Sequence, residues 1–209
     1  MRKDLKIRFC LITDRNFFVD ISSLFGAVEE ALRGGVRAVQ LREKDIVVRE
    51  VLSVAYQMRK LTAHYHAHLF INDRVDVAMA VEAEGVHLGQ NSMPASAAKK
   101  ASEGKLLVGV STHTLQEAAD AEKEGADFIT FGPVYHTPSK LKYGEPVGIA
   151  ALKKVCSEIP LPVFAIGGIT EDRIGEVMDC GAEGVAMISA VLGSRDIRST
   201  TERILRYLQ

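Results

Sequence analysis

Eight short apolar runs, each followed by a longer stretch with helical spacing, constrain the fold of this 209-residue chain more than any other feature. The apolar residues within a run are consecutive rather than alternating, which is typical of parallel strands covered on both faces. Strand-like and helix-like segments that alternate along a chain form βαβ units. The runs cover residues 7–13, 38–42, 69–72, 85–89, 106–111, 128–134, 163–167 and 184–189.

Glycines occur at the ends of several helical segments in this pattern. Helical candidates lie at 24–33, 48–63, 115–124 and 172–180, and glycine follows several of them, as expected of left-handed helix caps. No linker rich in Pro, Gly or Ser divides the chain. Eight βα units in one undivided domain predict a single (β/α)₈ TIM barrel over residues 1–209, near the lower size limit of that fold. A doubly wound open sheet is the alternative, although no glycine fingerprint follows the first run.

Composition excludes several classes of function. Lys and Arg number 26 against 27 Asp and Glu, so the net charge of −1 gives no reason to expect nucleic acid or an anionic membrane as a partner. No uncharged stretch approaches the roughly 18 residues that a membrane span needs. The apolar run at 9–13 is shorter than a signal peptide's apolar region of about 7–15 residues, so we expect a cytoplasmic protein.

The three cysteines, Cys10, Cys156 and Cys180, are odd in number and form no C-x-x-C pattern. Neither a disulfide framework nor a zinc site is indicated, and buried inert thiols are expected.

In a (β/α)₈ barrel, function resides where strands end and helices begin. Gln40, Arg42 and Lys44 alternate at such an end, so their side chains leave the strand on one face. Arginine with lysine suits a phosphate or diphosphate, because one offers a planar fork and the other a point charge. A solvated strand end, with Glu43 as a salt-bridge partner, is the alternative.

The third run ends in Asn72 and Asp73. Asp73 either caps the next helix or helps to hold Mg²⁺ while substrate phosphates supply the other oxygens. Gly167 and Gly168 end the seventh run and Ile188 and Ser189 the eighth, where such barrels usually bind phosphate through backbone N–H groups. Simple tight turns are the alternative there.

The sixth connection, residues 132–146, is the longest and is predicted to close over the substrate with Thr137, Ser139 and Lys140. Surface variation alone is the alternative reading.

Histidines give weaker signals. The His64-x-His66-x-His68 alternation precedes the third run, away from the predicted mouth, and is expected to be solvated. His87 lies inside an apolar run and is expected to be a satisfied core histidine. His113 and His136 are better placed, but no carboxylate partner or nucleophile signature accompanies them.

Seven motifs occur in a fixed order between residues 40 and 190. They are Gln40-Leu41-Arg42-Glu43-Lys44, Ile71-Asn72-Asp73, His87-Leu88-Gly89-Gln90, Gly109-Val110-Ser111-Thr112-His113-Thr114, Gly132-Pro133-Val134-Tyr135 with Thr137-x-Ser139-Lys140, Ile166-Gly167-Gly168-Ile169 and Met187-Ile188-Ser189-Ala190. No single motif is decisive, but the series resembles thiamine phosphate synthase and its TenI-like relatives.

The resemblance implies a small (β/α)₈ barrel and a transferase of thiamine biosynthesis. The synthase joins 4-amino-5-hydroxymethyl-2-methylpyrimidine diphosphate to 4-methyl-5-(2-phosphoethyl)thiazole and releases pyrophosphate. Its chemistry is dissociative: the pyrimidine C–O bond breaks to a stabilised cation, which the thiazole nitrogen captures. No general base is required for that step.

The resemblance also implies a role for each site residue. Arg42, Lys44 and Lys140 would hold the diphosphate, with Mg²⁺ bound through Asp73 and Ser111 bonded to pyrophosphate oxygens. Gln40 and Asn72 would line the same end of the site, and Thr137 and Ser139 would contact the ligands from the sixth connection. Gly168, Ile188 and Ser189 would bind the thiazole phosphate by backbone groups.

One position departs from the synthase pattern. Ser92 stands where the synthase places a second Mg²⁺-binding aspartate, a loss more typical of TenI-like thiazole tautomerases, which act on carboxylated thiazole phosphate. Pro133 stands where the tautomerase carries its histidine, whereas Arg42 and Lys44 are retained. The synthase is therefore the leading prediction, with the tautomerase and a non-catalytic thiamine-phosphate-binding protein as alternatives. The oligomeric state stays open, with a homodimer as one candidate.

Overall fold

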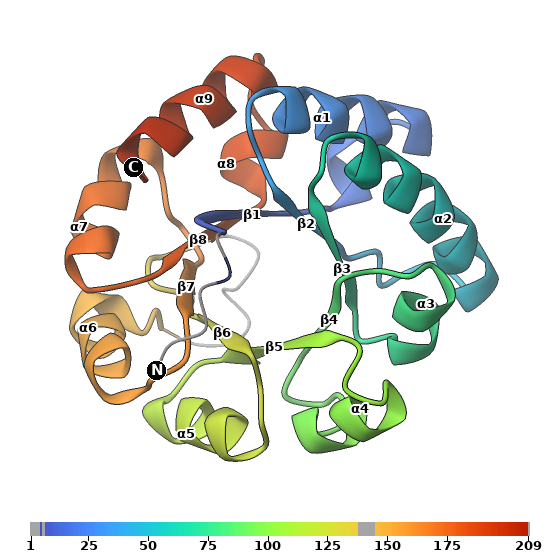
Figure 1. Cartoon of the computed structure of the whole chain (residues 1–209). Coiled ribbons are helices and arrows are strands. Elements are labelled where there is room, and N and C mark those ends of the chain that lie inside the picture. Colours follow the sequence, from blue (N-terminus) through green and yellow to red (C-terminus); the bar gives the residue numbers. More distant parts are fainter. Residues whose placement is uncertain (1–4, 6, 138–144, 209) are drawn as a thin grey trace.

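The chain forms a closed barrel of eight parallel strands surrounded by helices (Figure 1). This computed structural model describes residue 5, residues 7–137 and residues 145–208. The strands follow one another around the barrel in chain order, and β8 pairs with β1 to close it. The predicted (β/α)₈ barrel is confirmed.

Each predicted run coincides with one strand, although β3 begins one residue before its run and β5 ends one residue after its run. The strands are β1 (Phe9–Ile12), β2 (Ala38–Leu41), β3 (His68–Asn72), β4 (Gly85–Leu88), β5 (Leu107–Thr112), β6 (Phe128–Phe131), β7 (Val163–Ile166) and β8 (Gly184–Met187).

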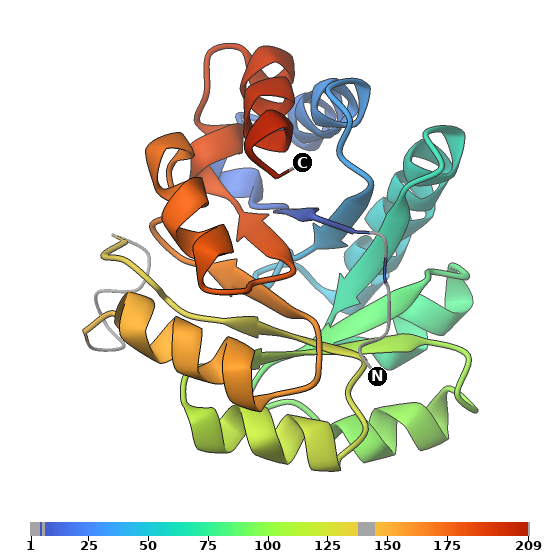
Figure 2. The same cartoon turned by 60° about the vertical axis from the view of Figure 1, so that its left-hand side comes forward.

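The helices form the outer ring, seen from a second direction in Figure 2. They are α1 (Ile21–Arg33), α2 (Val48–His64), α3 (Val75–Ala80), α4 (Ala95–Ala101), α5 (Leu115–Lys123), α6 (Gly148–Glu158), α7 (Ile174–Asp179), α8 (Ser189–Leu192) and α9 (Ile197–Tyr207), with 3₁₀ turns η1 (Arg15–Phe17) and η3 (Glu171–Arg173). The helix expected at 172–180 is thus a 3₁₀ turn followed by a shorter α-helix. No helix in the described part of the chain is long and apolar enough to cross a membrane.

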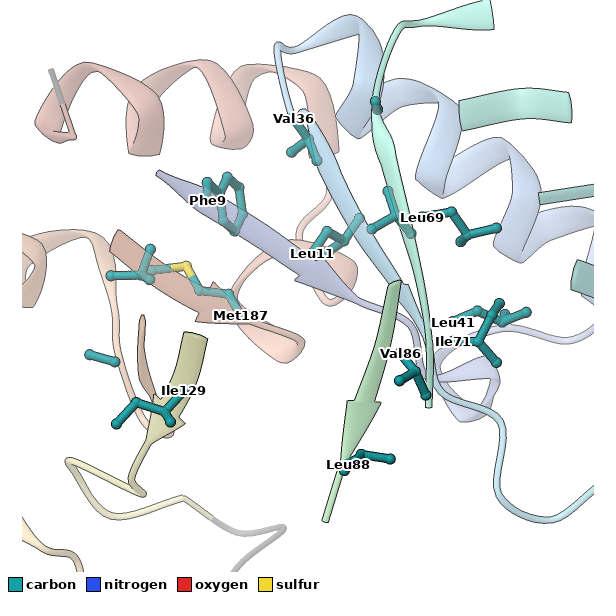
Figure 3. Packing of buried hydrophobic residues seen from close by; sticks show 14 of the residues in the cluster. Phe9, Leu11, Val36, Leu41, Leu69, Ile71, Val86, Leu88, Ile129 and Met187 are labelled. Carbon is teal, nitrogen blue, oxygen red and sulfur yellow. The ribbon is translucent and has the colours of Figure 1, made fainter. Parts of the chain in front are cut away.

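Buried apolar side chains form two cores. Leu11, Leu69 and Val86 belong to the larger core between the strands and the helix ring (Figure 3). The smaller core fills the barrel and consists of Leu5, Ile7, Ala38, Phe70, Phe128 and Phe164. Ala38, Phe128 and Phe164 come from the amino-terminal halves of their strands and Phe70 from the middle of β3, so this core lies towards the end of the barrel opposite the predicted site.

Aromatic rings pack edge to face inside this smaller core. The Phe128 ring centroid lies 5.2 Å from that of Phe70 and 5.7 Å from that of Phe164. Cys10 faces the same interior space, and burial raises the pKa of its thiol to about 12, as expected for an inert cysteine. The amino end of the barrel is therefore packed apolar material, which leaves the carboxyl ends of the strands as the place for polar chemistry.

Candidate active site

A line of hydrogen bonds joins the ends of β2 and β3. Gln40 Nε2 donates to Asn72 Oδ1 at 3.1 Å, and Asn72 Nδ2 donates to Asp73 Oδ2 at 2.7 Å. Gln40 is buried inside the barrel, while Asn72 and Asp73 are half-buried. Three residues predicted from two separate motifs therefore lie together at the mouth.

Asp73 is also tied to the loop that follows β4. Its backbone N–H donates to the His87 carbonyl at 2.9 Å, and its Oδ1 accepts from Gly89 N at 3.3 Å and from Ser92 Oγ. Its φ of 62° lies in the left-handed region, which these bonds hold in place. The residue that caps α3 is Arg74, and α3 has no side-chain cap bond. The helix-capping alternative for Asp73 is therefore wrong.

Ser92, the position where the synthase pattern predicts a second aspartate, belongs to the same hydrogen-bonded cluster as Asp73. Its hydroxyl accepts from Gly89 N at 2.7 Å and donates to Asp73. Ser92 thus fixes the orientation of Asp73.

A second polar network joins β4, β5 and β6, and His87 in it is paired in register with Asn72 of the first. His87 Nε2 is 3.0 Å from Ser111 Oγ and 3.3 Å from Thr130 Oγ1. The Gln90 side chain donates to the Ser111 carbonyl at 2.5 Å. Ser111 is half-buried near the carboxyl end of β5, and the His87 ring holds its hydroxyl at the mouth.

The imidazole of His87 is neutral at physiological pH. Burial lowers its pKa to about 4, against the opposing effect of the Asp73 charge and with a smaller contribution from Arg42. His87 is a satisfied buried histidine, as expected, but it also contacts a predicted site residue.

Arg42 and Lys44 follow β2 and flank a buried carboxylate. Arg42 is half-buried and Lys44 is exposed, whereas Glu43 is only 8% exposed. In the described residues, Glu43 forms no ion pair with either neighbour. It accepts from Thr13 Oγ1 at 2.6 Å and from Arg15 N at 3.1 Å, and burial raises its pKa. The alternative that made Glu43 a salt-bridge partner of these cations is wrong.

The loop after β7 packs against the start of the sixth connection. Gly168 has a φ of 65°, and a Cβ there would lie 2.5 Å from the His136 carbonyl oxygen, so only glycine allows this approach. Arg173 donates to the Gly168 carbonyl at 2.7 Å and lies 4.4 Å above the Tyr135 ring. Tyr135 in turn donates to Glu176 at 2.7 Å.

Three further predicted residues, Thr137, Ile188 and Ser189, lie at the same end of the barrel. Ile188 is half-buried and directly precedes α8, whose first residue is the exposed Ser189. Thr137 is half-buried at the end of the described stretch of the sixth connection. Ser139 and Lys140 lie outside the described residues.

Two histidines have carboxylate partners that the sequence reading missed. His113 Nδ1 lies 3.1 Å from Glu117 Oε2, and His136 Nε2 lies 3.4 Å from Glu145 Oε2. The sequence Thr114-x-x-Glu117 was a usable signal, because a glutamate at the third position of a helix reaches back to the residues at its N-terminus, here His113. Thr130 was also missed, although it is paired in register with Ser111.

These features define a (β/α)₈ barrel of the enzyme type, with its polar side chains gathered at the carboxyl ends of the strands. The family model for thiamine monophosphate synthase matches residues 9–191. The chain belongs to the thiamine monophosphate synthase family.

Individual relatives are similar over nearly their whole length. One relative, from Geobacter sulfurreducens, bears the name thiamine-phosphate synthase provisionally. It is 52% identical to this chain over 95% of this chain and 92% of the relative's length. The thiamine-phosphate synthase of Clostridium novyi is 39% identical, over 96% and 98%. A solved thiamine phosphate pyrophosphorylase from Pyrococcus furiosus superposes with a TM-score of 0.88 at 39% identity, over 97% and 96%. The predicted family and its synthase activity, a transferase activity, are confirmed.

Proposed function

We propose that the mouth of this barrel holds a pyrimidine diphosphate beside a thiazole phosphate and joins the two with release of pyrophosphate. The arrangement of Asp73 carries this proposal. Its carboxylate is held by donors from two neighbouring strand ends, and Arg42 follows β2, which pairs with β3 directly before Asp73. A fixed carboxylate and an arginine at adjacent strand ends suit a diphosphate that arrives with a divalent cation.

The donor set at Asp73 fits Mg²⁺. Oδ1 already accepts from Gly89 and Ser92, whereas Oδ2 accepts from Asn72 alone among the residues that the structure describes. A carboxylate oxygen has two lone pairs, so Oδ2 keeps a position for a metal ion. Among the described residues, no group of three or more His, Cys, Asp or Glu could hold a metal by itself. Phosphate oxygens and water would therefore complete the ligand set, as Mg²⁺ often requires.

When bound, Mg²⁺ neutralises negative charge that develops on the departing pyrophosphate. Arg42 and Lys44 bind and orient the diphosphate at the end of β2. With Nε2 protonated, neutral His87 donates to Ser111 Oγ, which leaves the Ser111 hydroxyl proton for a pyrophosphate oxygen. These donors act where charge develops, so they stabilise the transition state more than the substrate.

The thiazole phosphate belongs at the other side of the mouth in this proposal. Gly168, Ile188 and Ser189 offer backbone N–H groups at the ends of β7 and β8, and Thr137 adds a hydroxyl from the sixth connection. Ser139 and Lys140 are proposed to act from the same connection on the strength of the family motif. No side chain is needed as a base, because the attacking thiazole nitrogen carries a lone pair.

The assay that tests this function uses purified protein, both substrates and Mg²⁺. We expect pyrophosphate and thiamine phosphate in equal amounts, with turnover lost in EDTA. The tautomerase alternative, which Ser92 favours, predicts isomerisation of carboxylated thiazole phosphate that EDTA leaves unchanged. Absence of pyrophosphate at saturating substrate would overturn the proposed synthase chemistry in this chain.

A further inference from the structure

A carboxylate is buried in the middle of the proposed diphosphate-binding segment. Glu43 lies between Arg42 and Lys44, and successive side chains in an extended segment point to opposite sides. Its two neighbours are more exposed, while Glu43 is 8% exposed. The nearby Arg15 guanidinium pairs with Asp45 instead, at 3.1 and 2.5 Å. Burying a carboxylate without a cation is unfavourable, so its position calls for a physical reason.

Both carboxylate oxygens of Glu43 receive neutral donors from the end of β1. Oε1 accepts from Thr13 Oγ1 at 2.6 Å, and Oε2 accepts from Arg15 N at 3.1 Å. Thr13 is fully buried. These bonds link the connection after β1 to the segment after β2.

Thr13 connects Glu43 to the backbone of Arg42. Its N–H donates to the Gln40 carbonyl at 2.9 Å, and its Oγ1 accepts from Arg42 N at 2.9 Å. The registered pairing of β1 with β2 ends at Ile12 and Gln40. Thr13 therefore continues the connection between the two strands through its side chain, just where Arg42 leaves the sheet.

The ionised carboxylate fixes the direction of the Thr13 hydroxyl. A hydroxyl has one proton, and an ionised carboxylate can only accept. Glu43 thus accepts the hydrogen bond from the Thr13 hydroxyl, and the lone pairs of Thr13 Oγ1 remain available to accept from the Arg42 N–H. We propose that Glu43, acting through Thr13, is a positioning residue that holds Arg42 for the diphosphate. The inference rests on the diphosphate site proposed above.

The test compares Glu43→Gln with Asp45→Asn, which removes the same charge from an exposed position two residues away. The amide of Gln can accept from only one of Thr13 Oγ1 and Arg15 N, because only one of its two polar atoms is an acceptor. With an NH₂ group next to Thr13, the hydroxyl must accept instead of donate, and its fixed direction is lost. Binding of Mg²⁺ with pyrophosphate is measured by calorimetry, and KM is measured for each substrate. Circular dichroism and thermal unfolding check the fold of each variant.

We expect Glu43→Gln to weaken pyrophosphate binding about tenfold. KM for the pyrimidine diphosphate should rise by a similar factor. KM for the thiazole phosphate should change less than twofold, because β7 and β8 form that side. Loss of negative charge alone would strengthen anion binding in both variants, so the sign of the change separates positioning from charge. Unchanged or tighter binding in Glu43→Gln would overturn the inference.

A second pair of variants isolates the hydroxyl. Thr13→Val keeps the shape of Thr13 but removes the link, and it should weaken pyrophosphate binding like Glu43→Gln. Thr13→Ser keeps the hydroxyl and should restore binding. Equal binding by these two variants would overturn the role of Thr13. A wild-type protein that does not bind pyrophosphate would overturn the diphosphate site itself, and the positioning role with it.

Discussion

His87 shows how one side chain can serve both the core and the site. Its ring packs 5.7 Å from Phe128 inside the barrel, while its Nε2 supports the Ser111 hydroxyl from below. A charged imidazole would face the nearby Arg42, and burial keeps the ring neutral. The residue therefore delivers a hydrogen bond to the mouth without adding charge there.

The low pKa of His87 makes folding dependent on pH. The unfolded chain takes up a proton near pH 6.5, whereas the folded chain resists protonation down to about pH 4. Stability is therefore lost as pH falls through this window, by at most about 1.4 kcal/mol per pH unit from this group. We expect His87→Gln to show a shallower loss in urea denaturation at pH 7, 6 and 5. Parallel pH dependence in the two proteins would contradict a neutral His87.

At the scale of elements, glycine inside β5 decides how the barrel interior packs. Gly109 faces inward, and a Cβ there would lie 2.3 Å from Phe128 Cζ and 2.6 Å from His87 Nδ1. Phe128 cannot retreat easily, because Phe70 and Phe164 pack against it. Glycine has a weak propensity for strands, but at position 109 it leaves room for the rings of Phe128 and His87 inside the barrel.

Gly109→Ala should destabilise the protein by roughly 1–3 kcal/mol, the usual range for overpacking a core. Gly26 in α1 is the matched control, because its position has nothing within 4 Å of an added Cβ. Gly26→Ala should stabilise by about 0.5–1 kcal/mol through helix propensity. Urea denaturation of both variants measures the difference. Equal effects would mean that the barrel interior adapts to the added methyl group.

The whole molecule couples the site to stability because the strands form one closed sheet. The proposed diphosphate ligands come from the ends of β2, β3 and β5, which are brought together only in the folded barrel. Pyrophosphate with Mg²⁺ should raise the unfolding temperature, with about 2.7 kcal/mol of stabilisation at a hundredfold excess over Kd. Pyrophosphate in EDTA should give a smaller shift. Identical shifts with and without Mg²⁺ would contradict metal binding at this mouth.

Ser92→Asp and Asp73→Asn provide the matched arms of that experiment. A carboxylate at position 92 would adjoin Asp73, so the free protein should become less stable and the Mg²⁺-dependent shift larger. Asp73→Asn should remove the Mg²⁺-dependent part of the shift. An unchanged metal titration in Ser92→Asp would place Ser92 away from the metal.

Local patterns predicted the strands well and the helices less well. Each strand coincides with a predicted run to within one residue at either end or lies inside it, because consecutive apolar residues need cover on both faces. The segment 172–180 read as one helix, yet it begins as a 3₁₀ turn, a choice that the periodicity of its apolar residues does not encode. Of the site residues, Gln40, Asn72 and Asp73 were found from their positions at strand ends, and the structure brings them into contact.

The sequence by itself determined the barrel and the end at which its polar residues gather, because hydrophobic period and strand ends are local properties. Only the tertiary structure decided which of those groups touch. The bonds from Ser92 to Asp73 and from Thr13 to Glu43 join residues 19 and 30 positions apart. Such contacts depend on strand register and on closure of the barrel, which bring different connections within the roughly 3 Å reach of a hydrogen bond.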